Sequence, residues 1–236
     1  MSILSSDKMQ PYHHDRGFIF AFKVYQGKKA DCLSSSKSFV DCIENIVSRV
    51  TCSDIIHVEI IPVIRHVSDR EMIISSKAYS AYVGQGFNVH DSSFCTSDPN
   101  YTLVYIPMDN DTTVMGQDFL DSQHGKKYNY SALPLTILPA WCKRCKVELE
   151  ENADPVQYEL LNEHNKVFCS QLGLSLCYHC KVFSMPREDR GRFYIDPNYC
   201  SPAELYKMLM HMESPIAGCE PIAWDQNHII ISDENM

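Results

Sequence analysis

A cysteine at the expected start of a helix is the first residue whose setting suggests chemistry. Cys169 stands in VFCSQLGLSLC, where an extended segment is expected to turn into an amphipathic helix with Ser170 and Gln171 in its first turn. Unpaired backbone N–H groups and the positive end of the helix dipole favour a thiolate there over a thiol. The same N–H groups can bind the oxyanion of a tetrahedral intermediate. The position therefore suits a nucleophile, and a buried structural cysteine at a helix start is the alternative.

A histidine and a glutamate interrupt an apolar segment earlier in the chain. The run DIIHVEIIPVI at 54–64 has the composition of a strand covered on both faces, and His57 and Glu59 are the polar residues inside it. Residues two apart project from the same face of a strand, so Glu59 can orient the His57 ring or balance its charge. A rim ion pair or a solvent-facing Glu59 is the alternative. His66 and His90 lie in segments of loop composition, so structural roles are expected for them.

Two C-x2-C pairs are candidate metal ligands. A tetrahedral zinc site can be built from two such pairs of thiolates, although the segment 146–176 between them is longer than in common zinc ribbons. Zinc here would clamp this segment to the helix that Cys169 begins, and His179 could replace one thiolate. Reduced core cysteines and disulfides are the alternatives, and no cofactor is expected for catalysis. The four cysteines are Cys142, Cys145, Cys177 and Cys180.

Strands and helices must bring these candidates together. Aromatic and β-branched runs predict strands, and apolar residues at helical spacing predict amphipathic helices. The last helix opens with Ser201, Pro202 and Glu204, which form a capping box. The strands are expected at 17–25, 54–64, 71–83 and 101–107. The helices are expected at 34–50, at about 113–123, from Cys169 onward and at 201–212.

The domain organisation predicted from the sequence is a single domain over residues 1–236, since the chain has no repeat and no Gly/Ser-rich linker. A strongly acidic segment at about 142–165 is expected to be an exposed excursion. The residues after about 212 are expected to be an extension that wraps the surface.

The composition is that of an acidic globular protein. The chain has 236 residues, of which 44% are hydrophobic, and a formal net charge of −9, which argues against a nucleic-acid partner because phosphate affinity needs a basic surface. No apolar run approaches the ~18–20 residues of a transmembrane segment, and the N-terminus lacks the pattern of a secretory signal. These features predict a cytoplasmic location, where clustered cysteines are more often ligands or nucleophiles than disulfides. The sequence does not indicate an oligomeric state.

Four segments of the chain occur in the order found in a known family. They are DIIHVEI, then GKKYNY at 125–130, then KVFCSQLGLSL at 166–176, then SPAELYKML at 201–209. This set resembles the circularly permuted NlpC-type branch of papain-like thiol enzymes. That branch includes lecithin:retinol acyltransferase-like proteins, bacterial YiiX-like proteins, and proteins of poxviruses and other large DNA viruses. In it the strand that carries the histidine precedes the helix that carries the cysteine, and the cysteine commonly stands in an F-C-S motif. Here His57 lies in H-V-E-I, and Cys169 follows it in F-C-S.

The resemblance implies an α+β, papain-like fold in which an antiparallel sheet packs against helices and the nucleophile begins a helix. It implies a hydrolase or acyltransferase that attacks an amide or ester bond of a peptide or lipid substrate through Cys169 and His57. Tyr128 and Ser170 would lie beside the substrate. The third catalytic residue of the family often comes from the following strand, which here carries no well-placed histidine, so Glu59 is the expected third residue.

Two alternatives to an enzyme remain at this point. The first is a viral structural or host-interaction protein that keeps the papain-like fold with an idle Cys–His pair. The second is an acidic, zinc-stabilised interaction domain whose cleft is incidental. If the protein is viral, it is expected in the host cytoplasm or in the virion. Preferential reactivity of Cys169 would separate the enzyme from the first alternative. One equivalent of bound zinc, lost with unfolding in Cys142→Ser, would support the structural metal of the second.

Overall fold

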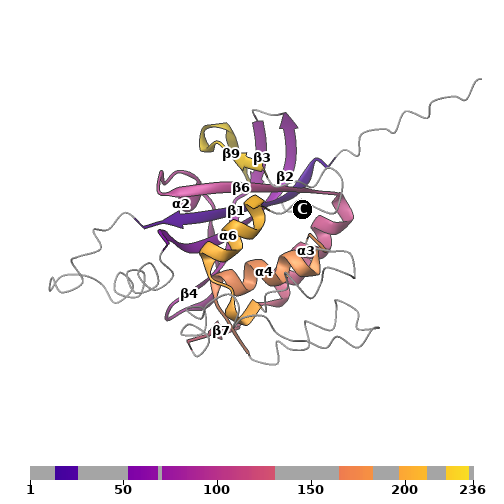
Figure 1. The fold of residues 1–236 in the computed structure, drawn as a ribbon. Helices are drawn as coiled ribbons and strands as arrows, with labels where there is room; N and C mark the ends of the chain where they lie inside the picture. The colour runs from indigo at the N-terminus through magenta and orange to yellow at the C-terminus, as the bar shows by residue number, and fades with distance from the viewer. Residues whose placement is uncertain are drawn as a thin grey trace, which may run out of the picture.

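The computed structural model of the chain describes residues 14–25, 53–68, 71–130, 165–182, 197–211 and 222–233. These residues form a mixed α+β fold with a mostly antiparallel sheet and a few helices (Figure 1). Along its main path the sheet has the strand order β10-β3-β2-β1-β6-β9, and β4 joins it through β2 and carries β5. The helix expected at 34–50 and the acidic segment at about 142–165, except for Asn165, lie outside the described residues.

The helices and strands have the following bounds. The main sheet contains β1 (Arg16–Val24), β2 (Ile55–Ser68), β3 (Glu71–Ser75), β4 (Lys77–Tyr82), β5 (Gly86–Asp91), β6 (Tyr101–Met108), β9 (Ile222–Trp224) and β10 (Ile229–Ser232). A parallel pair is formed by β7 (Lys127–Tyr128) and β8 (Lys166–Val167). The helices are α2 (Ser93–Thr96), α3 (Asn110–Ser122), α4 (Cys169–His179) and α6 (Pro202–His211), with 3-10 turns η3 (Pro197–Tyr199) and η4 (Gln226–His228).

The four strands predicted from the sequence are confirmed with one change, and β5, β7, β8, β9 and β10 are not predicted. Strands β1, β2 and β6 lie where they are expected, and the single strand expected at 71–83 is divided by a bend at Ser76 into β3 and β4. Strand β5 is not predicted, because Gly84 and Gly86 flank a reverse turn and few apolar residues alternate after them. Both histidines expected in loops lie on strands: His90 on β5, which pairs with β4, and His66 on β2, which runs beyond its predicted end at 64.

The helix starts follow from side-chain caps. The Asp109 carboxylate accepts a hydrogen bond from the Thr112 backbone N–H at 2.7 Å, so α3 begins a few residues before the expected position. In α6 the predicted capping box is confirmed. The Ser201 hydroxyl accepts from the Glu204 N–H at 3.2 Å, and the Glu204 carboxylate accepts from the Ser201 N–H at 2.9 Å. Each cap satisfies N–H groups that have no partner within the helix.

The long strand β2 connects the two halves of the sheet and is covered on both faces, as its apolar run predicts. One edge pairs with β1, and the other edge pairs first with β4, through Ile60 and Tyr79, and then with β3. Val58 and Ile60 belong to the core beneath α4, whereas Ile61 and Val63 belong to a second core that includes residues of β3 and β6. Because both faces are buried, a polar side chain on β2 needs partners inside the protein.

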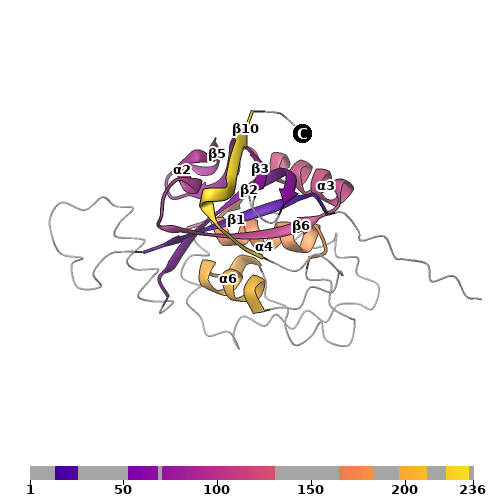
Figure 2. The same ribbon diagram turned by 90° about the horizontal axis from the view of Figure 1, so that it is seen from above.

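The two C-terminal strands show that the sheet is curled. β9 and β10 lie at opposite ends of the strand order, but only residues 225–228 separate them along the chain. Six strands laid flat would place them about 24 Å apart, whereas the connection spans at most about 17 Å. The sheet therefore curves so that its two edges approach each other, with the C-terminal strands crossing one side and α4 and α6 on the other (Figure 2).

Helix α4 is held close to both β1 and α6, and Gly173 makes this possible. A Cβ atom at Gly173 would lie 2.7 Å from Cδ2 of Leu205 and 3.3 Å from Cε1 of Phe20. Leu205 and Phe20 are fully buried, so neither side chain has room to move away. This close contact sets the distance between α4 and the sheet, and therefore helps to position Cys169, the first residue of α4.

Gly173→Ala is expected to lower the free energy of unfolding by about 1–3 kcal/mol, because overpacking outweighs the better helix propensity of alanine. Urea unfolding followed by circular dichroism measures the change. Ser175→Ala is the matched control on the same helix, since the Ser175 hydroxyl is buried with no hydrogen-bond partner among the described residues. If both variants are equally stable, α4 does not pack this closely.

Candidate active site

The local structure around Cys169 places the cysteine at the first position of α4. Strand β8 leads into Phe168, which is extended (φ −124°, ψ 166°), and the helix begins at the next residue. The first backbone hydrogen bond of the helix runs from the Leu172 N–H to the Phe168 carbonyl at 3.0 Å. The N–H groups of Cys169 and Ser170 precede it, at the positions where a helix offers its N–H groups to partners outside it. The predicted helix start at Cys169 is confirmed, and the cysteine side chain is 5% exposed.

The Gln171 side chain fastens this helix start to its surroundings. Its Oε1 accepts from the Phe168 N–H at 3.3 Å and from Nδ2 of Asn129 at 3.4 Å, and its Nε2 donates to Oδ1 of Asn198 at 2.7 Å. The start of α4 is thus tied to the segment that follows β7 and to η3. None of these three amides is identified as a site residue from the sequence. A buried amide at a helix start is a weak signal, because its partners lie on distant segments.

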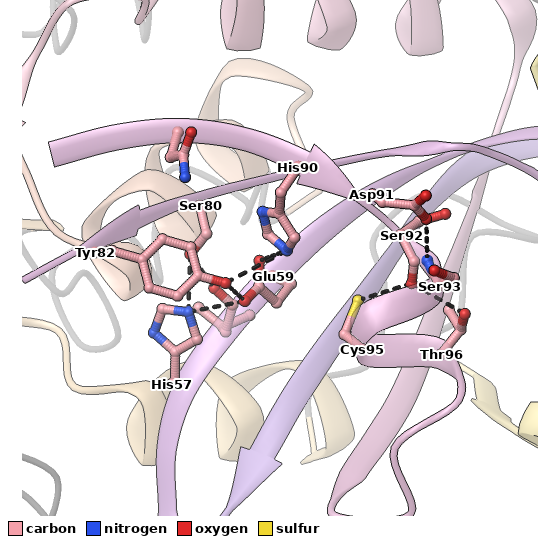
Figure 3. A network of polar contacts seen from close by, with 12 residues as sticks. His57, Glu59, Ser80, Tyr82, His90, Asp91, Ser92, Ser93, Cys95 and Thr96 are labelled. Atoms are coloured by element: carbon pink, nitrogen blue, oxygen red, sulfur yellow. Dashed lines mark hydrogen bonds and ion pairs between the residues drawn. The ribbon is translucent and has the colours of Figure 1, made fainter. Parts of the chain in front are cut away.

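His57 and Glu59 lie together on β2, as their spacing predicts. His57 Nε2 is 3.0 Å from Glu59 Oε1 and 3.1 Å from the hydroxyl of Ser80 on β4 (Figure 3). Ser80 uses its own hydrogen to donate to the Val58 carbonyl at 2.7 Å, so its oxygen can only accept from the ring. The proton of His57 is therefore on Nε2, which leaves Nδ1 as the nitrogen that can take a proton from a thiol.

Glu59 is fully buried, which excludes the alternatives of a rim or solvent-facing carboxylate. The Tyr82 hydroxyl donates to Oε1, and Nε2 of His90 lies 3.3 Å from Oε2, an ion-pair distance without hydrogen-bond alignment. Burial raises the pKa of the Glu59 carboxyl. The charge and hydrogen bond of His57, together with His90 and Tyr82, outweigh burial and lower the pKa below its usual 4.5. Glu59 is thus a carboxylate that receives donors only.

The Cys169 thiol and the His57 ring meet in the folded structure. Burial disfavours the charged ring, but the charges of Cys169 and Glu59 and hydrogen bonds to both raise the pKa of His57 from 6.5 to about 10. The sulfur and the ring are therefore close enough to interact. The site therefore holds a cysteine and a histidine that can exchange a proton, and the raised pKa of His57 favours a charged ring.

Tyr128 lies beside the sulfur, whereas the Ser170 side chain does not face the site. Burial and the negative charge of Cys169 raise the pKa of Tyr128, so its phenol stays neutral and can donate a hydrogen bond. The exposed Tyr130 packs edge-on against Tyr128, with ring centroids 5.0 Å apart. The hydroxyl of Ser170 is fully buried and donates to the Cys200 carbonyl at 2.7 Å. The expectation that Ser170 binds substrate is therefore corrected: its backbone N–H is the group it can offer.

The zinc prediction involves two pairs of cysteines, of which the structure describes the second pair. Cys142 and Cys145 lie outside the described residues, while Cys177 and Cys180 are buried free thiols at the end of α4. Burial, with Cys180 and Cys200 nearby, raises the pKa of Cys177 well above its usual value. Among the described residues no three His, Cys, Asp or Glu side chains are arranged to hold a metal ion. Structural zinc remains a prediction.

Comparison with known proteins found no match among family models, curated proteins or solved structures. Within the described ranges, no helix is long and apolar enough to cross a bilayer. The function is therefore inferred from the chemistry of the site.

Proposed function

We propose that this protein is a cysteine-dependent hydrolase or acyltransferase of the permuted papain-like type, acting on an amide or ester bond of a peptide or lipid. The observation that supports it most is the contact of Cys169, at the start of α4, with a His57 ring whose Nε2 is bonded to the buried Glu59. A histidine strand that precedes the cysteine helix agrees with the permuted order. An α+β fold with a mostly antiparallel sheet is compatible with this family.

The proposed reaction has two halves, acylation and deacylation of Cys169, and His57 transfers one proton in each half. The Cys169 thiolate attacks the carbonyl carbon, and the oxyanion binds the backbone N–H groups of Cys169 and Ser170. The His57 imidazolium then gives its Nδ1 proton to the leaving amine or alcohol, which leaves an acyl thioester. In the second half, His57 takes a proton from water or from an acceptor alcohol or amine as it attacks the thioester, and the thiolate is restored. Tyr128 would line the cleft.

A second candidate function rests on the low exposure of Cys169. A sulfur that is 5% exposed admits substrate poorly. The alternative is a structural or host-interaction protein, viral in origin, that keeps this fold with an idle Cys–His pair. The two candidates differ in the reactivity of the thiol.

Alkylation with iodoacetamide at about pH 6 tests the proposal, because an ordinary thiol is almost entirely protonated there and a thiolate held by His57 is not. Peptide mass spectrometry is expected to show Cys169 modified faster than every other cysteine of the folded chain. Cys169→Ser, which should remove the fast phase, and Cys95→Ser, which should not, are the matched pair of controls. Burial and the charge of Glu59 raise the pKa of Cys95. Labelling of Cys169 at or below the rate of the other cysteines would favour the idle protein.

A further inference from the structure

We propose that Tyr82 and His90 are positioning residues that hold the two carboxylate oxygens of Glu59, so that Oε1 faces His57. They would thereby set the lowest pH at which Cys169, paired with His57, still reacts as a nucleophile. The proposal rests on the proposed function and names two further residues of that site. Neither touches the cysteine, so neither is a catalytic residue.

The hydrogen-bond directions around Glu59 converge on its carboxylate. His57 Nε2–H and the Tyr82 O–H both donate to Oε1. Because Tyr82 uses its hydrogen on Glu59, its oxygen can accept from Nε2 of His90, which lies 3.3 Å away. The same His90 nitrogen is 3.3 Å from Oε2. Three neighbouring strands, β2, β4 and β5, thus bring their donors to one carboxylate (Figure 3).

The burial of Glu59 makes these donors necessary. A buried carboxylate without donors takes up a proton, since burial disfavours the charged form. A protonated or rotated Glu59 would leave the His57 Nε2–H with Ser80 as its remaining acceptor and would remove the charge that balances the imidazolium. Tyr82 and His90 oppose both changes, because the Tyr82 hydroxyl donates to Oε1 and His90 lies at ion-pair distance from Oε2.

Among the other titratable groups around this carboxylate, the exposed Asp91 carries a negative charge and the buried ones stay neutral. Burial and the charge of Glu59 raise the pKa of both Tyr82 and Cys95, so both stay neutral. The exposed Asp91 follows His90, and its hydrogen bonds to Ser93 lower its pKa. The positive charge that can face Glu59 is therefore on the histidines. The titratable groups near the carboxylate are His57, Tyr82, His90, Asp91, Cys95 and Tyr101.

The test measures the rate of Cys169 alkylation by iodoacetamide as a function of pH in the full chain. Tyr82→Phe keeps the ring and removes the hydroxyl that stabilises the charged Glu59. The acid limb of the profile is expected to move toward neutral pH by about one unit, the effect of one hydrogen bond to a charged group. Tyr79→Phe is the matched control, because Tyr79 lies on the same strand but its hydroxyl contacts Asp121 and Gln117.

Two further variants separate positioning from packing. His90→Leu is expected to move the acid limb in the same direction, and His90→Gln, which keeps an N–H donor, is expected to restore most of it. In a Glu59→Gln background, Tyr82→Phe is expected to cause no additional shift, since the two residues act through one contact.

The outcomes distinguish this proposal from the proposed function. If wild-type Cys169 is alkylated preferentially but neither Tyr82→Phe nor His90→Leu moves the acid limb, the positioning role is wrong and the enzyme proposal stands. A Tyr82→Phe shift that persists in the Glu59→Gln background also overturns it. If wild-type Cys169 shows no preferential alkylation, the proposed function itself fails.

Discussion

His57→Gln is expected to slow the alkylation of Cys169 at about pH 6 by about two orders of magnitude. Less than about 1% of an ordinary thiol, with a pKa of about 8.5, is thiolate at this pH, and the proposed mechanism needs His57 to raise that fraction. Glutamine is close to histidine in size and can still donate to Glu59, but it cannot accept the thiol proton. The rate constant is measured under native conditions by mass spectrometry of the peptide that contains Cys169.

The control for this experiment is His66→Gln. His66 lies on the same strand, β2, and packs against Tyr105 and Trp224, away from the cysteine. This variant is expected to leave the alkylation rate unchanged. Equal rates for wild type and His57→Gln would show that His57 does not activate the thiol. The proposed enzyme would then lack a general base for Cys169.

Glu59→Gln is expected to lower the free energy of unfolding by about 3 kcal/mol near pH 6. The substitution removes one partner of a buried ion pair and leaves the His57 charge without compensation, which typically costs about 3–5 kcal/mol. Urea unfolding of wild type and variant at a series of pH values measures the difference. The exposed Asp118→Asn on α3 is the control, and its stability relative to wild type should change little with pH.

The pH dependence of this difference has a defined sign. The pKa of Glu59 is lowered on folding, so its contribution is present above 4.5 and is lost as the pH falls through the folded value. The pKa of His57 is raised, so its contribution is present below 6.5 and is lost as the pH rises toward about 10. The advantage of wild type over Glu59→Gln should therefore be largest between these limits and decline on both sides. A difference that is independent of pH would mean that the two residues are not an ion pair.

Local patterns in the sequence were sufficient to predict several parts of the site. The position of Cys169 at a helix start follows from the change from an extended to a helical apolar pattern. The shared face of His57 and Glu59 follows from the two-residue period of a strand. The capping box of Ser201 and Glu204 follows from their spacing. Each of these depends on residues that are neighbours along the chain, and backbone geometry fixes how such neighbours lie.

Only the tertiary structure decided which distant side chains meet. Glu59 could be named from the sequence, but the sheet register brings Tyr82 and His90 to its carboxylate and Ser80 to the His57 ring. The packing of α4 against β2 brings Cys169 to the His57 ring, and it leaves the Ser170 hydroxyl to donate to the Cys200 carbonyl. Periodicity shows which face a side chain is on, but the pairing of strands and helices far apart in the chain decides what lies opposite that face.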